Sequence, residues 1–229
     1  MKKTLIFSSL LALTLSAQAA VNITEPELIK IDGPAMQPVL NADATQLQFT
    51  AEDLSHRSVV NLADGNVSLV TTNPRTAPAH STLTESPDFA EADYTSIRLV
   101  RNGMEKSISP LKDAHSYLWA SLSPDGSRLL FTEPFQGVFV ADADGSNPVR
   151  IAAKGDFPAW VDNSTIAYVL SHDDGYVILD AAVMVCDLTD MSTVKATDNA
   201  TVVGESSAAA GTVVYSTLDG KIYKFNVKH

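Results

Sequence analysis

The stretch Leu122-Ser-Pro-Asp-Gly-Ser-Arg-Leu-Leu-Phe-Thr132 decides the fold of this chain. Its Ser-Pro-Asp-Gly segment is typical of a turn, because proline presets one backbone angle and glycine accepts a positive φ. The apolar run that follows the turn is typical of a strand. Two more apolar runs, Gly137 to Ala141 and Val149 to Ala152, flank a second turn at Asp142-Ala-Asp-Gly-Ser-Asn147. Together these segments predict four antiparallel strands with short connections, which is the unit of one propeller blade.

The same phrase recurs along the chain as a turn residue, an aliphatic residue four positions later and an aromatic ring six positions later. Its five copies are Asp43-Leu47-Phe49, Asp88-Ala92-Tyr94, Asp125-Leu129-Phe131, Asp162-Ile166-Tyr168 and Ala209-Val213-Tyr215. The rings are 45, 37, 37 and 47 residues apart, close to the period of about 40 to 50 residues of one blade. Because positions four and six have the same parity, both side chains lie on one face of a strand. We expect that face to be buried.

The repeat predicts an all-β fold, a five-bladed β-propeller formed by a single domain of residues 20–229. The expected blades cover approximately residues 36–72, 78–112, 115–153, 156–197, and 202–229 together with 27–31. The fifth copy ends one strand short, after Lys221 to Val227, while an additional strand, Glu27 to Ile31, precedes the first copy. We expect this N-terminal strand to complete the last blade, because closure of the ring removes exposed sheet edges.

Residues 1–19 are typical of a cleaved secretory signal. They begin with Lys2 and Lys3, continue with an apolar stretch from Leu5 to Leu15, and end in Ala17-Gln-Ala19. The apolar stretch is shorter than the roughly 20 residues of a transmembrane helix. We therefore expect a periplasmic or secreted protein without a transmembrane anchor.

The composition restricts the possible partners. Without Lys2 and Lys3 the chain carries 14 basic and 27 acidic side chains, a net charge of −13. This charge repels phosphate backbones, so we expect no nucleic-acid partner. Cys186 is the only cysteine and follows the apolar run Ala181 to Val185, so we expect a buried, unreactive thiol.

Three segments resemble the WD40-like Pro-Asp repeat (PD40) of TolB-like secreted bacterial propellers. They are Leu122 to Phe131, Asp142 to Asn147 and Pro158 to Tyr168. The second and fifth copies match less well, since Ser86-Pro-Asp88 lacks the glycine and Ser207 to Gly211 lacks the acid. The resemblance implies a non-catalytic scaffold that binds another envelope or secreted protein. The alternative function is a carbohydrate-binding or carbohydrate-active propeller.

Five side chains are candidate binding residues at the mouth of the central channel, near the starts of innermost strands. They are His80, His115, Tyr117, Trp119 and Asp156. The two imidazoles and Asp156 could bind a metal or an anion, although solvated or hydrogen-bonded histidines are the simpler interpretation. Tyr117 and Trp119 could form an exposed aromatic anchor for a protein or a sugar.

Other motifs have simpler structural interpretations, and we predict no catalytic residue, no metal and no cofactor. The string Asp142 to Asn147 resembles a calcium loop, but Ala153 stands where such a loop needs a bidentate Glu, so we expect a hairpin turn. Gly204-Glu-Ser-Ser-Ala208 lacks the last glycine of a nucleophile elbow. Trp160 lies within the repeat, and we expect it to pack between blades.

Overall fold

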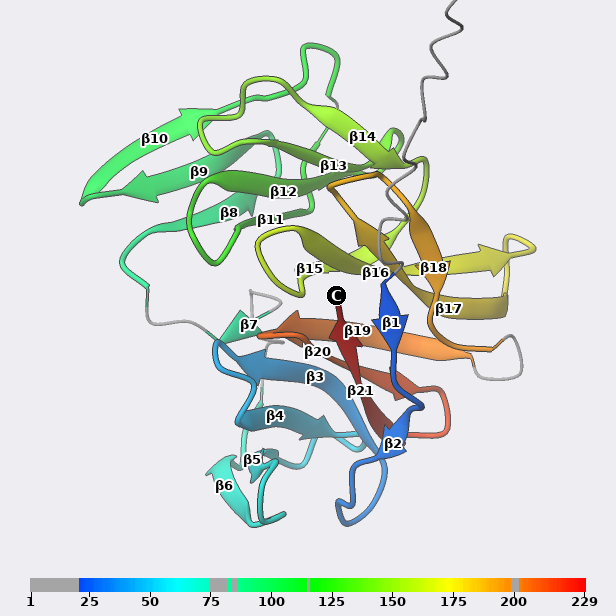
Figure 1. Ribbon diagram of the computed structural model, residues 1–229. Coiled ribbons are helices and arrows are strands. Elements are labelled where there is room, and N and C mark those ends of the chain that lie inside the picture. Colours follow the sequence, from blue (N-terminus) through cyan, green and yellow to red (C-terminus); the bar gives the residue numbers. More distant parts are fainter. Residues whose placement is uncertain (1–20, 75–81, 84–85, 115, 199–201) are drawn as a thin grey trace, which may run out of the picture.

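The computed structural model describes residues 21–74, 82–83, 86–114, 116–198 and 202–229. These residues form twenty-one strands and no helix, and therefore include no helix that could cross a membrane. The strands form five sheets, which follow one another along the chain as the blades of a five-bladed β-propeller (Figure 1). The predicted fold class is confirmed.

Blades I, III and IV each contain the four antiparallel strands that the repeat predicts. Blade I has β3 (Ala35–Asn41), β4 (Gln46–Ala51), β5 (Arg57–Asn61) and β6 (Val67–Thr71). Blade III has β11 (Trp119–Leu122), β12 (Arg128–Glu133), β13 (Gly137–Asp142) and β14 (Val149–Ala152). Blade IV has β15 (Asp156–Trp160), β16 (Thr165–Asp173), β17 (Ile178–Asp187) and β18 (Thr193–Lys195). The Ser-Pro-Asp-Gly turn thus joins the innermost strand of blade III to its neighbour.

Blade V is completed by both ends of the described chain. Its strands are β19 (Val203–Ala209), β20 (Thr212–Thr217) and β21 (Ile222–Lys228), with β1 (Asn22–Ile23) and β2 (Glu27–Leu28) both paired to β21. The backbone nitrogen of Ile29 also donates to the oxygen of Ile222 at 2.9 Å. In Figure 1 the blue N-terminal strands lie beside the red β21. The predicted closure of the last blade by the N-terminal strand is confirmed.

Blade II departs from the pattern. It has three strands in its sheet, β8 (Phe89–Asp93), β9 (Ser96–Arg101) and β10 (Met104–Ile108). The strand that precedes its turn, β7 (Thr82–Leu83), pairs in parallel with β3 of blade I instead. Tyr94 is 66% exposed with a φ of +43°, so the expectation of a buried ring is wrong at this copy. Tyr94 lies beyond the end of β8, in the short connection to β9, and its backbone forms only an isolated bridge to Tyr117.

The core consists of four apolar clusters, and each lies between two consecutive blades. They join blade II to III, III to IV, IV to V, and V to I. Phe49, Phe131, Tyr168 and Tyr215 are the buried rings of the other four copies. Within the described ranges no fifth cluster joins blade I to blade II. The ring is therefore packed most firmly at four of its five interfaces.

Candidate functional site

A cavity of about 200 Å³ lies at one end of the innermost strands. Its walls come from the ends of β3, β11, β15 and β19 and from the start of β8, so every blade contributes. The lining residues are Ala42, Ser86, Asp88 to Ala90, Ser121 to Pro124, Trp160 and Ala208 to Ala210. A concave site to which all blades contribute is a common place for ligands to bind.

The repeated turn explains why the cavity forms at this end. In each blade the turn follows the innermost strand, and equivalent turns lie at the same end of the ring. Alanine occupies several of these positions, among them Ala42 in blade I and Ala208 to Ala210 in blade V. Because alanine extends only one carbon from the backbone, space remains between the turns.

Hydrogen bonds between neighbouring blades fix the walls. Trp160, which is buried between blades III and IV as expected, donates from Nε1 to the backbone oxygen of Ser121 at 3.3 Å. Three further bonds join Asp125 N to Asn163 Oδ1, Leu40 N to Ser207 Oγ, and Gly211 N to Val161 O, at 3.0, 3.2 and 2.9 Å. These bonds fix the walls that blades I, III, IV and V contribute.

The lining is apolar with a few polar groups. Asp88 is its one charged side chain, and Asp88 Oδ1 accepts a hydrogen bond from the backbone nitrogen of Asn102 at 2.8 Å. The hydroxyl of Ser121 is buried without a hydrogen-bond partner among the described residues. Beside Asp88, the Phe89 ring lies 5.1 Å below the guanidinium carbon of Arg98. An apolar group that carries a positive charge or a hydrogen-bond donor matches these walls.

Asp125, in the turn at the rim, makes the stability depend on pH. Ser123 Oγ and then the Ser127 nitrogen and hydroxyl donate to its carboxylate, which lowers its pKa to about 2. The folded-state pKa lies below the ordinary value of 3.8, so the ionised group stabilises the fold above about pH 4, and this contribution is lost as the pH falls toward 2.

Replacement of Asp125 by Asn is expected to remove this pH dependence. The amide oxygen can still accept from the Ser127 nitrogen, but the variant has no carboxylate to protonate. The difference in unfolding free energy between wild type and Asp125→Asn should be largest above pH 4 and shrink toward pH 2. Urea titrations at several pH values measure it, and parallel curves for the two proteins would contradict the assignment.

The structure separates the residues that the sequence grouped together. His80 and His115 lie outside the described residues. Tyr117 is only 1% exposed, its hydroxyl accepts from the Leu111 nitrogen at 3.0 Å, and its ring contacts Phe131 edge to face. The expectation of an exposed anchor at Tyr117 is therefore wrong: the ring belongs to the core between blades II and III, and burial raises the pKa of its hydroxyl.

Trp119 and Asp156 do not line the cavity. They begin β11 and β15, whereas the cavity lies where these strands end. Trp119 is partly exposed, and its indole nitrogen is buried without a hydrogen-bond partner in the described part of the chain. Asp156 is exposed and accepts a hydrogen bond from the Ser171 hydroxyl at 3.2 Å. Trp119 and Asp156 thus lie at the end of the innermost strands opposite to the cavity.

Sequence reasoning also missed Glu205, on the innermost strand β19. Burial raises the pKa of its carboxyl, and the backbone of Gln37 in β3 partly offsets this effect. The position of Glu205 along β19 could have identified the side of the strand on which it lies, because every second residue of an innermost strand lies on the same side. Glu205 does not line the cavity.

The remaining candidate motifs have structural roles. Asp142 Oδ2 accepts from the Ser146 hydroxyl and the Asn147 amide at 3.2 and 2.7 Å within the turn between β13 and β14. Cys186 is a buried free thiol, and burial raises its pKa. Among the residues that the structure describes, no group of three or more His, Cys, Asp or Glu side chains is placed to hold a metal ion.

The fold and the cavity define the class of this chain as a five-bladed β-propeller with an axial pocket. Among solved structures it is similar to a putative TolB from Agrobacterium tumefaciens, with 16% identity, a TM-score of 0.49, and 91% of this chain and 87% of the other covered. TolB from Acinetobacter baumannii is 14% identical, with a TM-score of 0.42 and coverage of 86% and 55%.

A catalytically inactive virginiamycin B lyase from Staphylococcus aureus, solved with quinupristin, is 12% identical, with a TM-score of 0.43 and coverage of 87% and 68%. No protein-family model matches the chain, and no curated protein sequence matches it.

Proposed function

We propose that this protein is a non-catalytic binding scaffold of the bacterial envelope, which holds a segment of another envelope or secreted protein in its axial cavity. The observation that carries the proposal is the cavity itself, lined by all five blades and by apolar side chains around Asp88. Four of the five blades that form the walls are joined by hydrogen bonds, and such preorganised walls lose little conformational freedom on binding, which favours affinity. The matching segment combines an apolar side chain with a Lys, an Arg or another cationic group.

The envelope location rests on the sequence. Residues 1–19 have the pattern of a secretory signal, and the Pro-Asp repeats resemble those of TolB-like secreted propellers. The excess of acidic side chains also favours a cationic partner. Carbohydrate binding is less well supported, because one of the two aromatic residues behind it, Tyr117, is part of the core.

A substitution that fills the cavity tests the proposal. Ala42 is an exposed residue of the rim, so Ala42→Trp should block the cavity without disturbing the core. Ala63, an exposed residue of the turn between β5 and β6 outside the cavity lining, provides the matched control Ala63→Trp. A photo-crosslinking residue at Leu122 identifies the partner in an envelope extract of the source bacterium, and titration with the purified partner gives its affinity.

We expect Ala42→Trp to weaken this affinity more than about tenfold, equivalent to about 1.4 kcal/mol, and Ala63→Trp to leave it unchanged. Asp88→Asn keeps an acceptor for the Asn102 nitrogen but removes the charge, and should weaken binding by about tenfold. Equal affinity of the two Trp variants, or a glycan that binds through Trp119, would contradict the proposal.

A further inference from the structure

The hairpin between β16 and β17 extends beyond the rest of blade IV. The two strands remain paired as far as Asp173 and Ile178. On one side, β15 pairs with β16 only as far as Val169, and on the other, β18 begins to pair with β17 at Met184. The end of the hairpin is therefore a two-stranded ribbon without a neighbouring strand, and Figure 1 shows it projecting from the ring.

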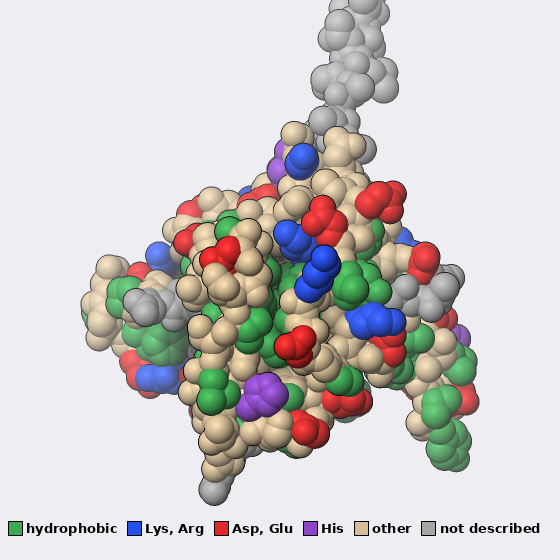
Figure 2. All heavy atoms as spheres, turned by 90° about the horizontal axis from the view of Figure 1, so that it is seen from below, with side chains coloured by type: hydrophobic (Ala, Val, Ile, Leu, Met, Phe, Trp, Pro, Cys, Tyr) green, Lys and Arg blue, Asp and Glu red, His purple; other side chains and the backbone are tan. Residues whose placement is uncertain are grey.

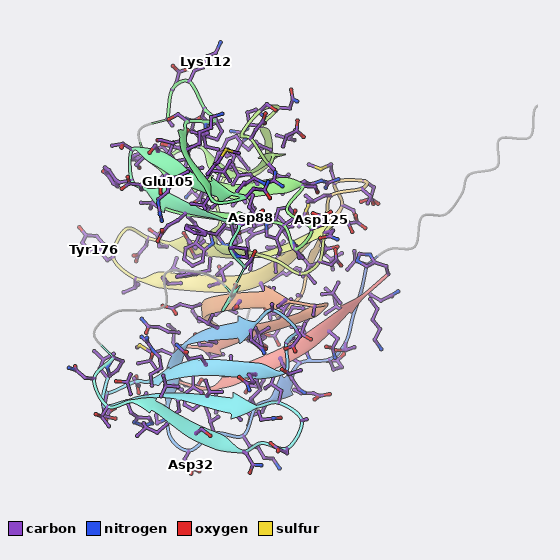
Figure 3. The ribbon with its side chains drawn as sticks, turned by 90° about the vertical axis from the view of Figure 1, so that its left-hand side faces the viewer. Asp32, Asp88, Glu105, Lys112, Asp125 and Tyr176 are labelled. Atoms are coloured by element: carbon purple, nitrogen blue, oxygen red, sulfur yellow. The ribbon has the colours of Figure 1, made fainter. Side chains whose placement is uncertain are left out.

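Four consecutive apolar side chains form the end of this ribbon, which we call the hairpin tip. They are Tyr176, Val177, Ile178 and Leu179, with exposures of 95, 58, 45 and 51%. Figure 3 shows Tyr176 at the outer end of the hairpin, and the matching projection in Figure 2 ends in hydrophobic side chains. The tip contributes to none of the four apolar clusters of the core. An exposed apolar patch of this kind marks an interaction surface.

Hydrogen bonds hold the tip in one shape. Asp174 Oδ1 accepts from the backbone nitrogens of Tyr176 and Val177, each at 2.9 Å, and Asp173 Oδ1 accepts from Gly175 at 2.8 Å. Gly175 has a φ of +92°, which glycine adopts readily. Because these bonds order the turn in the free protein, little conformational entropy remains to be lost when the tip binds.

The charges around the hairpin tip indicate what kind of partner surface it binds. Asp173, Asp174 and Asp180 flank the apolar residues. Among the described residues, the one ion-pair contact of these three carboxylates is with His172, whose Nδ1 lies 3.6 Å from Asp180 Oδ2. The chain contains no Lys or Arg between residues 155 and 194. Anionic lipid surfaces and a second copy of this chain, which has a net charge of −11, are both repelled by such a surface.

We propose that the hairpin tip docks into an apolar cleft bordered by Lys and Arg on a partner protein. The apolar side chains would fill the cleft while the three carboxylates pair with its rim, since complementary charge steers association and fixes orientation. This surface is separate from the axial cavity, because none of its residues lines that cavity. A scaffold with both sites brings two polypeptide segments together.

The experiment uses the intact protein with a photo-crosslinking residue at Val177, incubated with an envelope extract. The captured protein is identified, purified and titrated against four variants. Tyr176→Ser with Val177→Ser removes the apolar tip. Asp173→Asn with Asp180→Asn removes two charges and keeps the hydrogen-bond acceptors. Leu69→Ser, at a 62% exposed position of β6, controls for loss of an apolar surface residue elsewhere, and Ala42→Trp blocks the axial cavity.

We expect the tip variant to weaken binding of the purified protein by about thirtyfold, as for a central interface residue. The charge variant should weaken it by about tenfold and reduce its salt dependence. Leu69→Ser and Ala42→Trp should leave it unchanged, so this result stands even if the cavity proposal fails. No captured protein, capture of a second copy, cosedimentation with phosphatidylcholine vesicles, or equal binding by the charge variant would overturn the inference.

Discussion

The Gly137→Ala variant is expected to unfold about 10 °C below the wild type. Gly137 opens β13 with a φ of +109°, and a Cβ there would come within 2.9 Å of Ala153 O and closer still to Ala152 O. These are backbone atoms, so they cannot turn aside as a side chain would. Backbone strain costs about 1 to 3 kcal/mol and overpacking about 1 to 3 kcal/mol, and each kcal/mol lowers the melting temperature of a chain of this size by about 2 to 4 °C.

Gly65→Ala separates the two causes. Gly65 also has a positive φ, +74°, but nothing lies within 4 Å of a Cβ built there. This control should cost only the strain of the left-handed backbone, about 1 to 2 kcal/mol. Calorimetry or circular dichroism on heating gives both melting temperatures. Equal shifts for the two variants would mean that contact with the backbone of Ala152 and Ala153 is not the main cost.

Phe131→Ala is expected to lower the free energy of unfolding by about 4 kcal/mol. Its ring is fully buried between blades II and III, stacked on Phe139 with centroids 5.4 Å apart and in edge contact with Tyr117 at 5.8 Å. Truncation of a buried phenylalanine costs about 3 to 5 kcal/mol, because it leaves a cavity in addition to removing apolar area from the core. Urea unfolding measures the loss.

Phe135 provides the matched control on the same hairpin. It follows the end of β12 and is 78% exposed, so Phe135→Ala should change the free energy by no more than about 0.5 kcal/mol. A large effect at Phe135, or a small one at Phe131, would contradict the account of a core divided among the interfaces between blades.

The main features of the fold could be predicted because local and global signals agree in most blades. In blade III the Ser-Pro-Asp-Gly turn precedes a strand in which Leu129 and Phe131 stand two positions apart. Both side chains therefore lie on one face of the strand, and both are buried. The additional strand at the N-terminus and the incomplete fifth copy indicated closure before any contact was known. These inferences depend on turn chemistry and on counting strands, which a single sequence contains.

Blade II could not be predicted in the same way, because the sequence of a strand does not identify the strand with which it pairs. The strand at Thr82–Leu83 pairs with β3 rather than with the strand that follows it. Tyr94 then lies in a connection instead of a ladder, and its ring is exposed. The pairing of β7 with β3 depends on the assembled ring, because the edge of a sheet pairs with the strand that the neighbouring blades place beside it.

The described residues that the sequence placed at the channel mouth do not line the cavity. Reasoning from residue type favoured aromatic and charged side chains near the starts of innermost strands, and so selected Tyr117, Trp119 and Asp156. The cavity instead lies among small residues at the ends of those strands, such as Ala42 and Ala209. A cavity exists where side chains are short, and composition alone does not reveal where short side chains from several blades meet.

The pairing of β21 with β1 and β2 also determines when the protein can fold. Thr24 Oγ1 accepts a hydrogen bond from the backbone nitrogen of Asn226, 202 residues further along the chain. Blade V therefore cannot be completed until β21 has been synthesised. Contacts between such distant residues form slowly, because a long loop must close before the pairing stabilises it. Closure of the ring is therefore expected to be the last step of folding, after the local hairpins of blades II, III and IV have formed.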